Sequence, residues 1–197
     1  MNLKSTKSLR IALIAVILGV VGITVAYAAL STSLNVTVSK VTQNALTWNV
    51  GFTGTSASAS VAGTSSTGRT CGTASITAST VTVADTTLSK PDDSCTYTLT
   101  IKNSGTIPAK LTSITPTKPT GTNVTCGTAS GATMVCGNIT YKLTSDAAGT
   151  TALPTNTTLN SNATQTVYLV VKYTGTTLNS SEVTQSNAKF ALKYDQA

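Results

Sequence analysis

The residues of this chain best suited to covalent chemistry are its four cysteines, Cys71, Cys95, Cys126 and Cys136. In an exported chain an even number of cysteines indicates disulfides, and four cysteines allow three pairings. The short separations along the chain favour Cys71–Cys95 and Cys126–Cys136. Zinc binding is the competing interpretation, but the sequence has no C-x-x-C spacing and no histidine.

Other catalytic chemistry has little support in the sequence. Without histidine, a Ser-His-Asp or Cys-His nucleophile and an H-E-x-x-H site are excluded. Nucleotide-binding glycine motifs are also missing. The adjacent acids Asp92 and Asp93 are compatible with a weak calcium site or with a solvated turn, and we favour the turn. We therefore predict a protein that is not an enzyme and has no catalytic residue, metal or cofactor.

The first 28 residues have the order of a secretory signal peptide. Lys4, Lys7 and Arg10 precede an apolar run over 11–25, which ends at the small-x-small site Ala26-Tyr27-Ala28. We predict cleavage after Ala28 by a signal peptidase, and a location outside the cell or on its surface. The alternative is an uncleaved membrane anchor, because residues 11–30 are about long enough to cross a bilayer.

The composition argues against binding to nucleic acid. The net charge is +7, but the basic residues after the leader are scattered singly, and only 10% of all residues are charged. Threonine is the most frequent residue, and its β-branched, uncharged side chain suits strand faces that meet water. This composition is typical of extracellular β-proteins and surface filaments.

After the leader, apolar and polar residues alternate with the period of a β-strand. About nine short strands separated by Gly, Pro and Asn turns predict an all-β fold, with a single β-sandwich of jelly-roll or Ig-like type over residues 42–197. Residues 54–70 are small and polar, and we expect a long surface loop there. The expected strands include 46–52, 76–83, 97–102, 107–111, 139–143, 167–173 and 190–194, and a turn is expected over 126–132.

Residues 29–41 form a separate strand candidate directly after the cleavage site. Its alternating apolar residues are Leu34, Val36 and Val38, flanked by Leu30 and Val41. Cleavage would leave this strand as a mobile end, able to complete the sheet of another copy. The alternative is that it is the first strand of its own sandwich.

Five segments of the chain together carry a resemblance to a known family: 26–31, 34–41, 45–52, 97–106 with Pro108-Ala109, and 190–197. In this order they resemble the TasA/camelysin-type secreted surface and biofilm-matrix fibre proteins. The resemblance implies a jelly-roll subunit that forms a head-to-tail homopolymer by donor-strand exchange, and a leader cut by a dedicated signal peptidase. The four cysteines depart from the family pattern, and the protease activity described for some relatives does not carry over to a chain without histidine. The alternative function is a monomeric secreted or membrane-tethered adhesin or carbohydrate-binding module.

The motif N-x-[ST] marks candidate N-glycosylation sites in a host that modifies asparagine. Several copies are expected by chance in a chain so rich in serine and threonine. The six asparagines are Asn35, Asn123, Asn138, Asn156, Asn162 and Asn179.

Overall fold

The computed structural model of the chain describes residues 13–18, 40, 45–63, 68–121, 124–178 and 183–197. The chain divides into two units, residues 1–44 and 45–197. In the first unit, residues 13–18 are helical. Among the described residues, no helix has both the length and the apolar character needed to cross a membrane.

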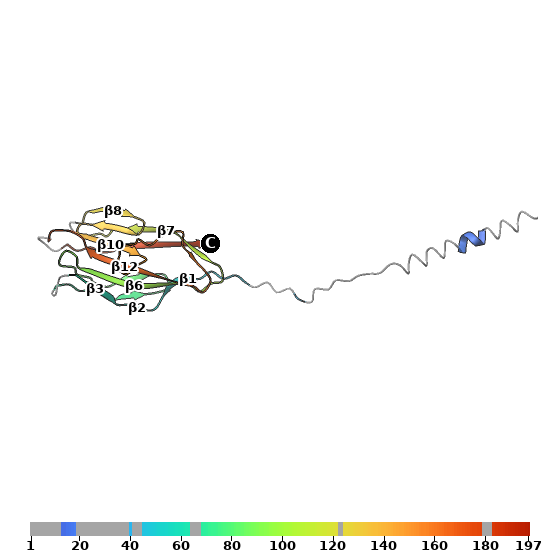
Figure 1. The fold of residues 1–197 in the computed structure, drawn as a ribbon, viewed down its shortest axis with the longest axis horizontal. Helices are drawn as coiled ribbons and strands as arrows, with labels where there is room; N and C mark the ends of the chain where they lie inside the picture. The colour runs from blue at the N-terminus through green and yellow to red at the C-terminus, as the bar shows by residue number, and fades with distance from the viewer. Residues whose placement is uncertain (1–12, 19–39, 41–44, 64–67, 122–123, 179–182) are drawn as a thin grey trace, which may run out of the picture. The chain divides into compact units, whose positions relative to one another are not determined.

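The second unit is built from antiparallel sheets, which confirms the predicted all-β class (Figure 1). Its described part contains thirteen strands. They are β1 (Val50–Thr53), β2 (Ser56–Ala57), β3 (Ala59–Ala62), β4 (Ala74–Ile76), β5 (Val81–Val83), β6 (Ser94–Asn103), β7 (Ala109–Thr117), β8 (Cys126–Ser130), β9 (Thr133–Cys136), β10 (Ile139–Thr144), β11 (Thr158–Leu159), β12 (Thr164–Tyr173) and β13 (Lys189–Gln196).

The largest sheet has the order β1-β6-β12-β10-β9-β8, with β3 also paired to β6. Its two longest strands, β6 and β12, lie side by side, with Leu99 opposite Val167. Along β6 buried residues alternate with more exposed ones, because successive side chains of a strand point to opposite faces. Tyr97, Leu99 and Ile101 therefore share the buried face of this sheet.

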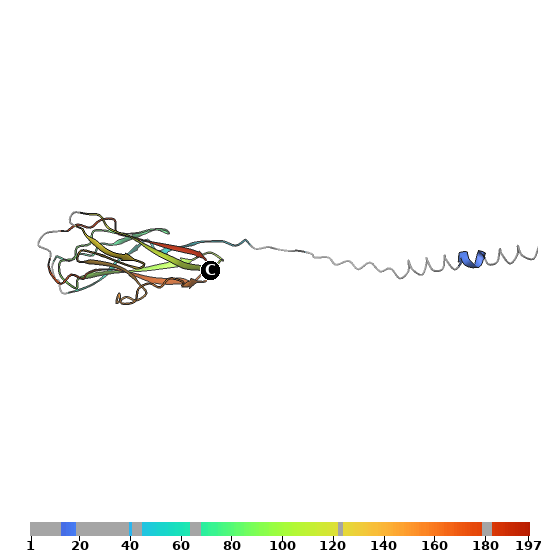
Figure 2. The same ribbon diagram turned by 90° about the horizontal axis from the view of Figure 1, so that it is seen from above.

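Two smaller sheets, β11-β7-β13 and β2-β4-β5, supply the remaining strands (Figure 2). One core cluster packs Leu111 of β7 with Ile101 of β6. A second packs Ile76 of β4 with Leu99 of β6. Both small sheets thus cover the same face of β6, and each fully buried large apolar side chain contributes about 1.5–3 kcal/mol.

The strand expected over 46–52 is present only in its second half. β1 begins at Val50, whereas Leu46 and Trp48 are 70% and 45% exposed. The backbone before β1 bonds to a turn instead of a strand, with the Thr106 N–H donating to the Thr47 carbonyl at 2.9 Å. The alternating pattern continues through this segment, but no second layer covers it.

Three other expectations are also wrong in detail. Residues 76–83 form a hairpin of β4 and β5 rather than one strand, closed by a 2.8 Å hydrogen bond from the Thr77 N–H to the Thr80 carbonyl. The loop expected over 54–70 contains β2 and β3, and the turn expected at 126–132 contains β8. Small polar residues have a weak strand preference. β2, β3 and β8 are strands because they pair with β4, β6 and β9, respectively.

Candidate functional site: an apolar groove at two sheet edges

The predicted polymerisation residues Leu30, Leu34, Val36, Val38 and Val41 lie outside the described residues, as do Asn35, Asn123 and Asn179. The other three candidate glycosylation sites are described. Asn156 and Asn162 are exposed, with φ of 66° and 61°. Asn138 is half-buried, and its side-chain amide donates to the Tyr173 hydroxyl at 3.0 Å. Among the three described sites, the open positions for a sugar are therefore Asn156 and Asn162.

Both favoured disulfides are present in the structure, Cys71–Cys95 and Cys126–Cys136. The first ties the segment before β4 to the start of β6, where Cys95 is fully buried. The second joins β8 to β9, across a register in which the two cysteines are opposite each other.

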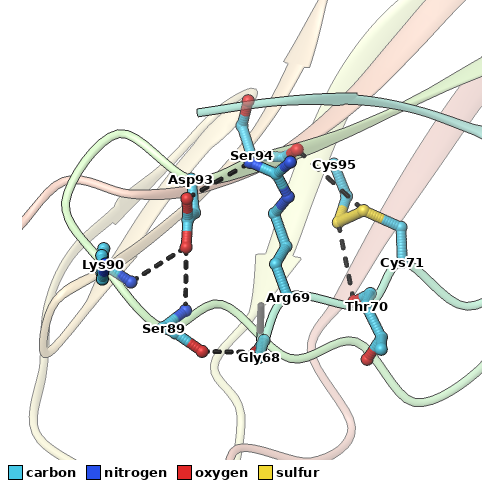
Figure 3. Close-up of polar contacts among 9 residues, drawn as sticks. All are labelled: Gly68, Arg69, Thr70, Cys71, Ser89, Lys90, Asp93, Ser94 and Cys95. Carbon is cyan, nitrogen blue, oxygen red and sulfur yellow. Dashed lines mark hydrogen bonds and ion pairs between the residues drawn. A yellow bond between two sulfur atoms is a disulfide. The ribbon is translucent and has the colours of Figure 1, made fainter. Parts of the chain in front are cut away.

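Asp93 lies beside the first disulfide and is completely buried (Figure 3). Its carboxylate accepts hydrogen bonds from the backbone N–H groups of Ser89 (3.0 Å) and Lys90 (2.9 Å). The Arg69 guanidinium forms an ion pair with the other oxygen at 3.3 Å. A solvated turn is therefore correct for Asp92, whose side chain is 72% exposed, and wrong for Asp93.

These contacts join the loop that contains Arg69 to the loop over 89–93, and we call this group of contacts the clasp. The Ser89 hydroxyl also donates to the Gly68 carbonyl, so both loops are joined by a charge pair and by backbone contacts. Among the described residues no group of three His, Cys, Asp or Glu side chains is placed to hold a metal ion. The oxygens of Asp93 accept N–H donors from both loops, and these bonds hold the loops together.

A groove lined mainly by apolar side chains lies between β1 and β13. Its volume is ≈ 210 Å³, below the 300–1,000 Å³ typical of small-molecule pockets. This space suits a few apolar side chains better than a cofactor. The groove is lined by Val50, Gly51, Phe52, Ala78, Ser79, Ile101, Leu192 and Tyr194.

Each wall of the groove is the last strand of its sheet. β1 pairs with β6 on one side, and on the other side the Phe52 N–H donates to the Ala78 carbonyl at 2.9 Å. β13 pairs with β7, and no second strand pairs with it in the part of the chain that the structure describes. Edge strands present backbone N–H and C=O groups that can pair with another strand. The groove therefore combines apolar walls with the open edge of β13, whereas the outer side of β1 is partly occupied by Ala78.

Sequence reasoning assigned 46–52 and 190–194 to strands but did not place them together. Leu192 and Tyr194 alternate with the exposed Ala191 and Lys193 along β13, which identifies one apolar face. That alternation does not show which other segment the face meets. The groove is therefore a finding of the tertiary structure.

Tyr194 brings a polar hydroxyl group into the lining of the groove. Its hydroxyl donates to the Gln165 side-chain oxygen at 2.9 Å. Burial raises the pKa of Tyr194 from 10.0 to about 12, because the phenolate would lose its hydration. The folded state thus favours the protonated hydroxyl.

The raised pKa of Tyr194 predicts a loss of stability in alkali. Below pH 10 the stabilising contribution is complete, and it is lost as the pH rises toward 12, because the unfolded chain releases the proton first. Urea unfolding midpoints should therefore fall more steeply over this range for the native chain than for Tyr194→Phe. Both proteins keep the other tyrosines, so an equal fall in the two would contradict this assignment.

Comparison with protein family models, curated proteins and solved structures finds no match for this chain. A functional proposal therefore depends on the features of the chain itself. Those features are a groove lined mainly by apolar side chains, the open edge of β13 in the described part of the chain, and two disulfides.

Proposed function

We propose that this protein is the structural subunit of an extracellular surface filament or biofilm-matrix fibre, joined head to tail by its N-terminal strand. The observation that carries the proposal is the apolar groove between the edges β1 and β13. After removal of the leader at Ala28, residues 29–41 of one copy insert into this groove of the next. The partners are then copies of the same chain, with a signal peptidase acting during export.

The chemistry of the proposed donor strand fits the groove. Leu34, Val36 and Val38 alternate with polar residues, so all three occupy one face of an extended segment. An added strand satisfies open backbone groups while alternate side chains fill pockets. A contact between two different surfaces of the same chain repeats without closing, which produces a filament.

The proposed fold is a β-sandwich of jelly-roll or Ig-like type. Two smaller sheets packing on one face of the largest sheet support this assignment. The resemblance to TasA/camelysin-type proteins favours the jelly roll. Disulfides and a low content of charge are consistent with a location outside the cell.

Two alternatives predict a monomer. In one, the strand over 34–41 folds onto β1 of its own domain. In the other, the protein is a secreted or tethered sugar-binding module. A sugar platform requires several exposed aromatic rings, whereas Trp48 is the only aromatic residue classed as exposed in the described part of the chain. The filament is therefore the better-supported function.

A pair of neighbouring substitutions on β13 tests the groove. Leu192→Lys places a charge among its apolar walls, whereas Ala191→Lys adds the same charge on the exposed face of the same strand. Negative-stain electron microscopy of the mature chain should show fibres for the native protein and Ala191→Lys. Fibres should be absent for Leu192→Lys, because desolvating an unpaired ammonium opposes strand insertion.

Thermal unfolding of both variants provides the control for folding. Leu192 also packs against the core, so a loss of fibres reports on the groove only when Leu192→Lys unfolds in a cooperative transition like that of the native chain. A native mature chain that stays monomeric at high concentration would overturn the filament proposal. Normal fibres from a folded Leu192→Lys would show that the strand binds elsewhere.

A further inference from the structure

Two exposed apolar side chains lie close together immediately before β1. Leu46 is 70% exposed and Trp48 is 45% exposed. The other exposed large apolar residues of the described second unit, Val61 and Leu178, are isolated along the chain. We call residues 45–49 the entry segment, because they lead from the proposed donor strand into β1.

The entry segment is held in place by the turn that follows β6. The Ser104 N–H donates to the Asn49 carbonyl at 2.7 Å, and the Thr47 N–H donates to the Thr106 hydroxyl at 2.8 Å. Gly105 permits this close approach, since an added Cβ would lie 2.8 Å from the Asn49 nitrogen. Leu46 and Trp48 alternate with the bonded residues, and they are therefore presented on a fixed backbone.

The apolar pair is also free of nearby charge along the chain. Residues 45–53 contain no charged side chain, and neither does the turn over 103–107. Burial of these two segments against another protein would therefore desolvate no charged side chain of their own. Tryptophan is enriched at the centres of protein interfaces, where its large ring contributes strongly to affinity.

Chain length limits where this pair can lie in a filament. Val41, the last residue of the proposed donor strand, is five residues before Leu46. Five residues span at most about 18 Å when fully extended. When the strand is bound in a neighbouring copy, Leu46 must remain within that distance of the point where the strand leaves the groove.

We infer that Leu46 and Trp48 form a second contact with the copy that receives the donor strand, and that they become buried on polymerisation. The inference rests on the proposed filament and adds a contact outside the groove. Donor strand and entry segment then bind the same neighbour, one after the other along the chain. This second contact fixes the orientation of adjacent subunits, which a strand attached by a flexible link would leave free.

Trp48 is the single tryptophan of the chain and reports directly on this contact. Fluorescence of the mature chain should be recorded as monomer and as fibre, with acrylamide as the quencher. On polymerisation the emission should move to shorter wavelength, and quenching should fall several-fold. Fibres in which Trp48 is quenched as readily as in the monomer would overturn the second contact and leave the filament proposal intact.

Matched substitutions test the energetic role of the pair. Leu46→Thr should raise the critical concentration for fibre formation by about tenfold, because it removes a large apolar side chain from the contact. Val61→Thr, at a side chain that is 49% exposed, should leave this concentration unchanged. Equal effects of the two substitutions would overturn the inference, and the thermal unfolding midpoint of each variant controls for folding.

A membrane is the competing partner for an exposed tryptophan. The monomeric Leu192→Lys variant should therefore be mixed with vesicles of phosphatidylcholine and phosphatidylglycerol. Unchanged Trp48 emission supports a contact with another copy of the chain. A shift to shorter wavelength on vesicles, without fibres, would overturn that assignment and identify a lipid surface instead. A mature native chain that forms no fibres would overturn both the filament and this contact.

Discussion

Deletion of residues 29–39 from the mature chain should abolish fibre formation and leave a folded monomer. The deletion removes Leu34, Val36 and Val38, the side chains proposed to fill the groove. Burial of each contributes about 1.5–3 kcal/mol, so their combined loss weakens subunit association by at least about a thousandfold. Electron microscopy and analytical ultracentrifugation measure the result.

Addition of the missing strand as a peptide provides the control for this deletion. A peptide of residues 29–41 should bind the truncated monomer and raise its unfolding midpoint, because a ligand that binds only the folded state stabilises it. The same peptide with Leu34, Val36 and Val38 replaced by threonine should not bind. Fibres formed by the truncated chain, or a native mature chain that is monomeric at high concentration, would contradict donor-strand exchange.

Replacement of Asp93 by alanine should destabilise the domain by about 3–5 kcal/mol, because the change breaks a buried ion pair. The carboxylate is fully buried, and it is paired with Arg69 at 3.3 Å. Its loss also leaves the N–H groups of Ser89 and Lys90 without their acceptor. The urea dependence of unfolding, measured by circular dichroism, gives the change in free energy.

The adjacent acid supplies a matched control. Asp92→Asn removes an exposed charge that pairs with Lys172 at 2.9 Å, and a surface pair contributes about 1 kcal/mol or less. Asparagine also tolerates the positive φ of 70° at this position. Asp93→Asn should therefore cost much more than Asp92→Asn. Equal costs for these two isosteric changes would show that the clasp contributes no special stability.

The sequence alone predicted the cores of the two longest strands and favoured the disulfide pairing that the structure has. Alternation over 97–102 and 167–173 identifies the cores of β6 and β12, because a strand with one buried face has a period of two. Short separations along the chain correctly favoured Cys71–Cys95 and Cys126–Cys136. The strand cores depend on neighbours in the sequence, so a local pattern is enough to predict them, whereas the disulfide pairing rested on choosing the shortest separations among three possible pairings.

Only the tertiary structure decided the short strands, the buried charge and the groove. β3 consists of small residues, and it is a strand because it pairs with β6. Asp93 is buried because Arg69 reaches it from 24 residues earlier in the chain. The groove brings together Val50, Ile101 and Leu192, which belong to three strands that are far apart in the sequence. Each of these features depends on pairing and packing between remote segments, and no local pattern of residues specifies which remote segments meet.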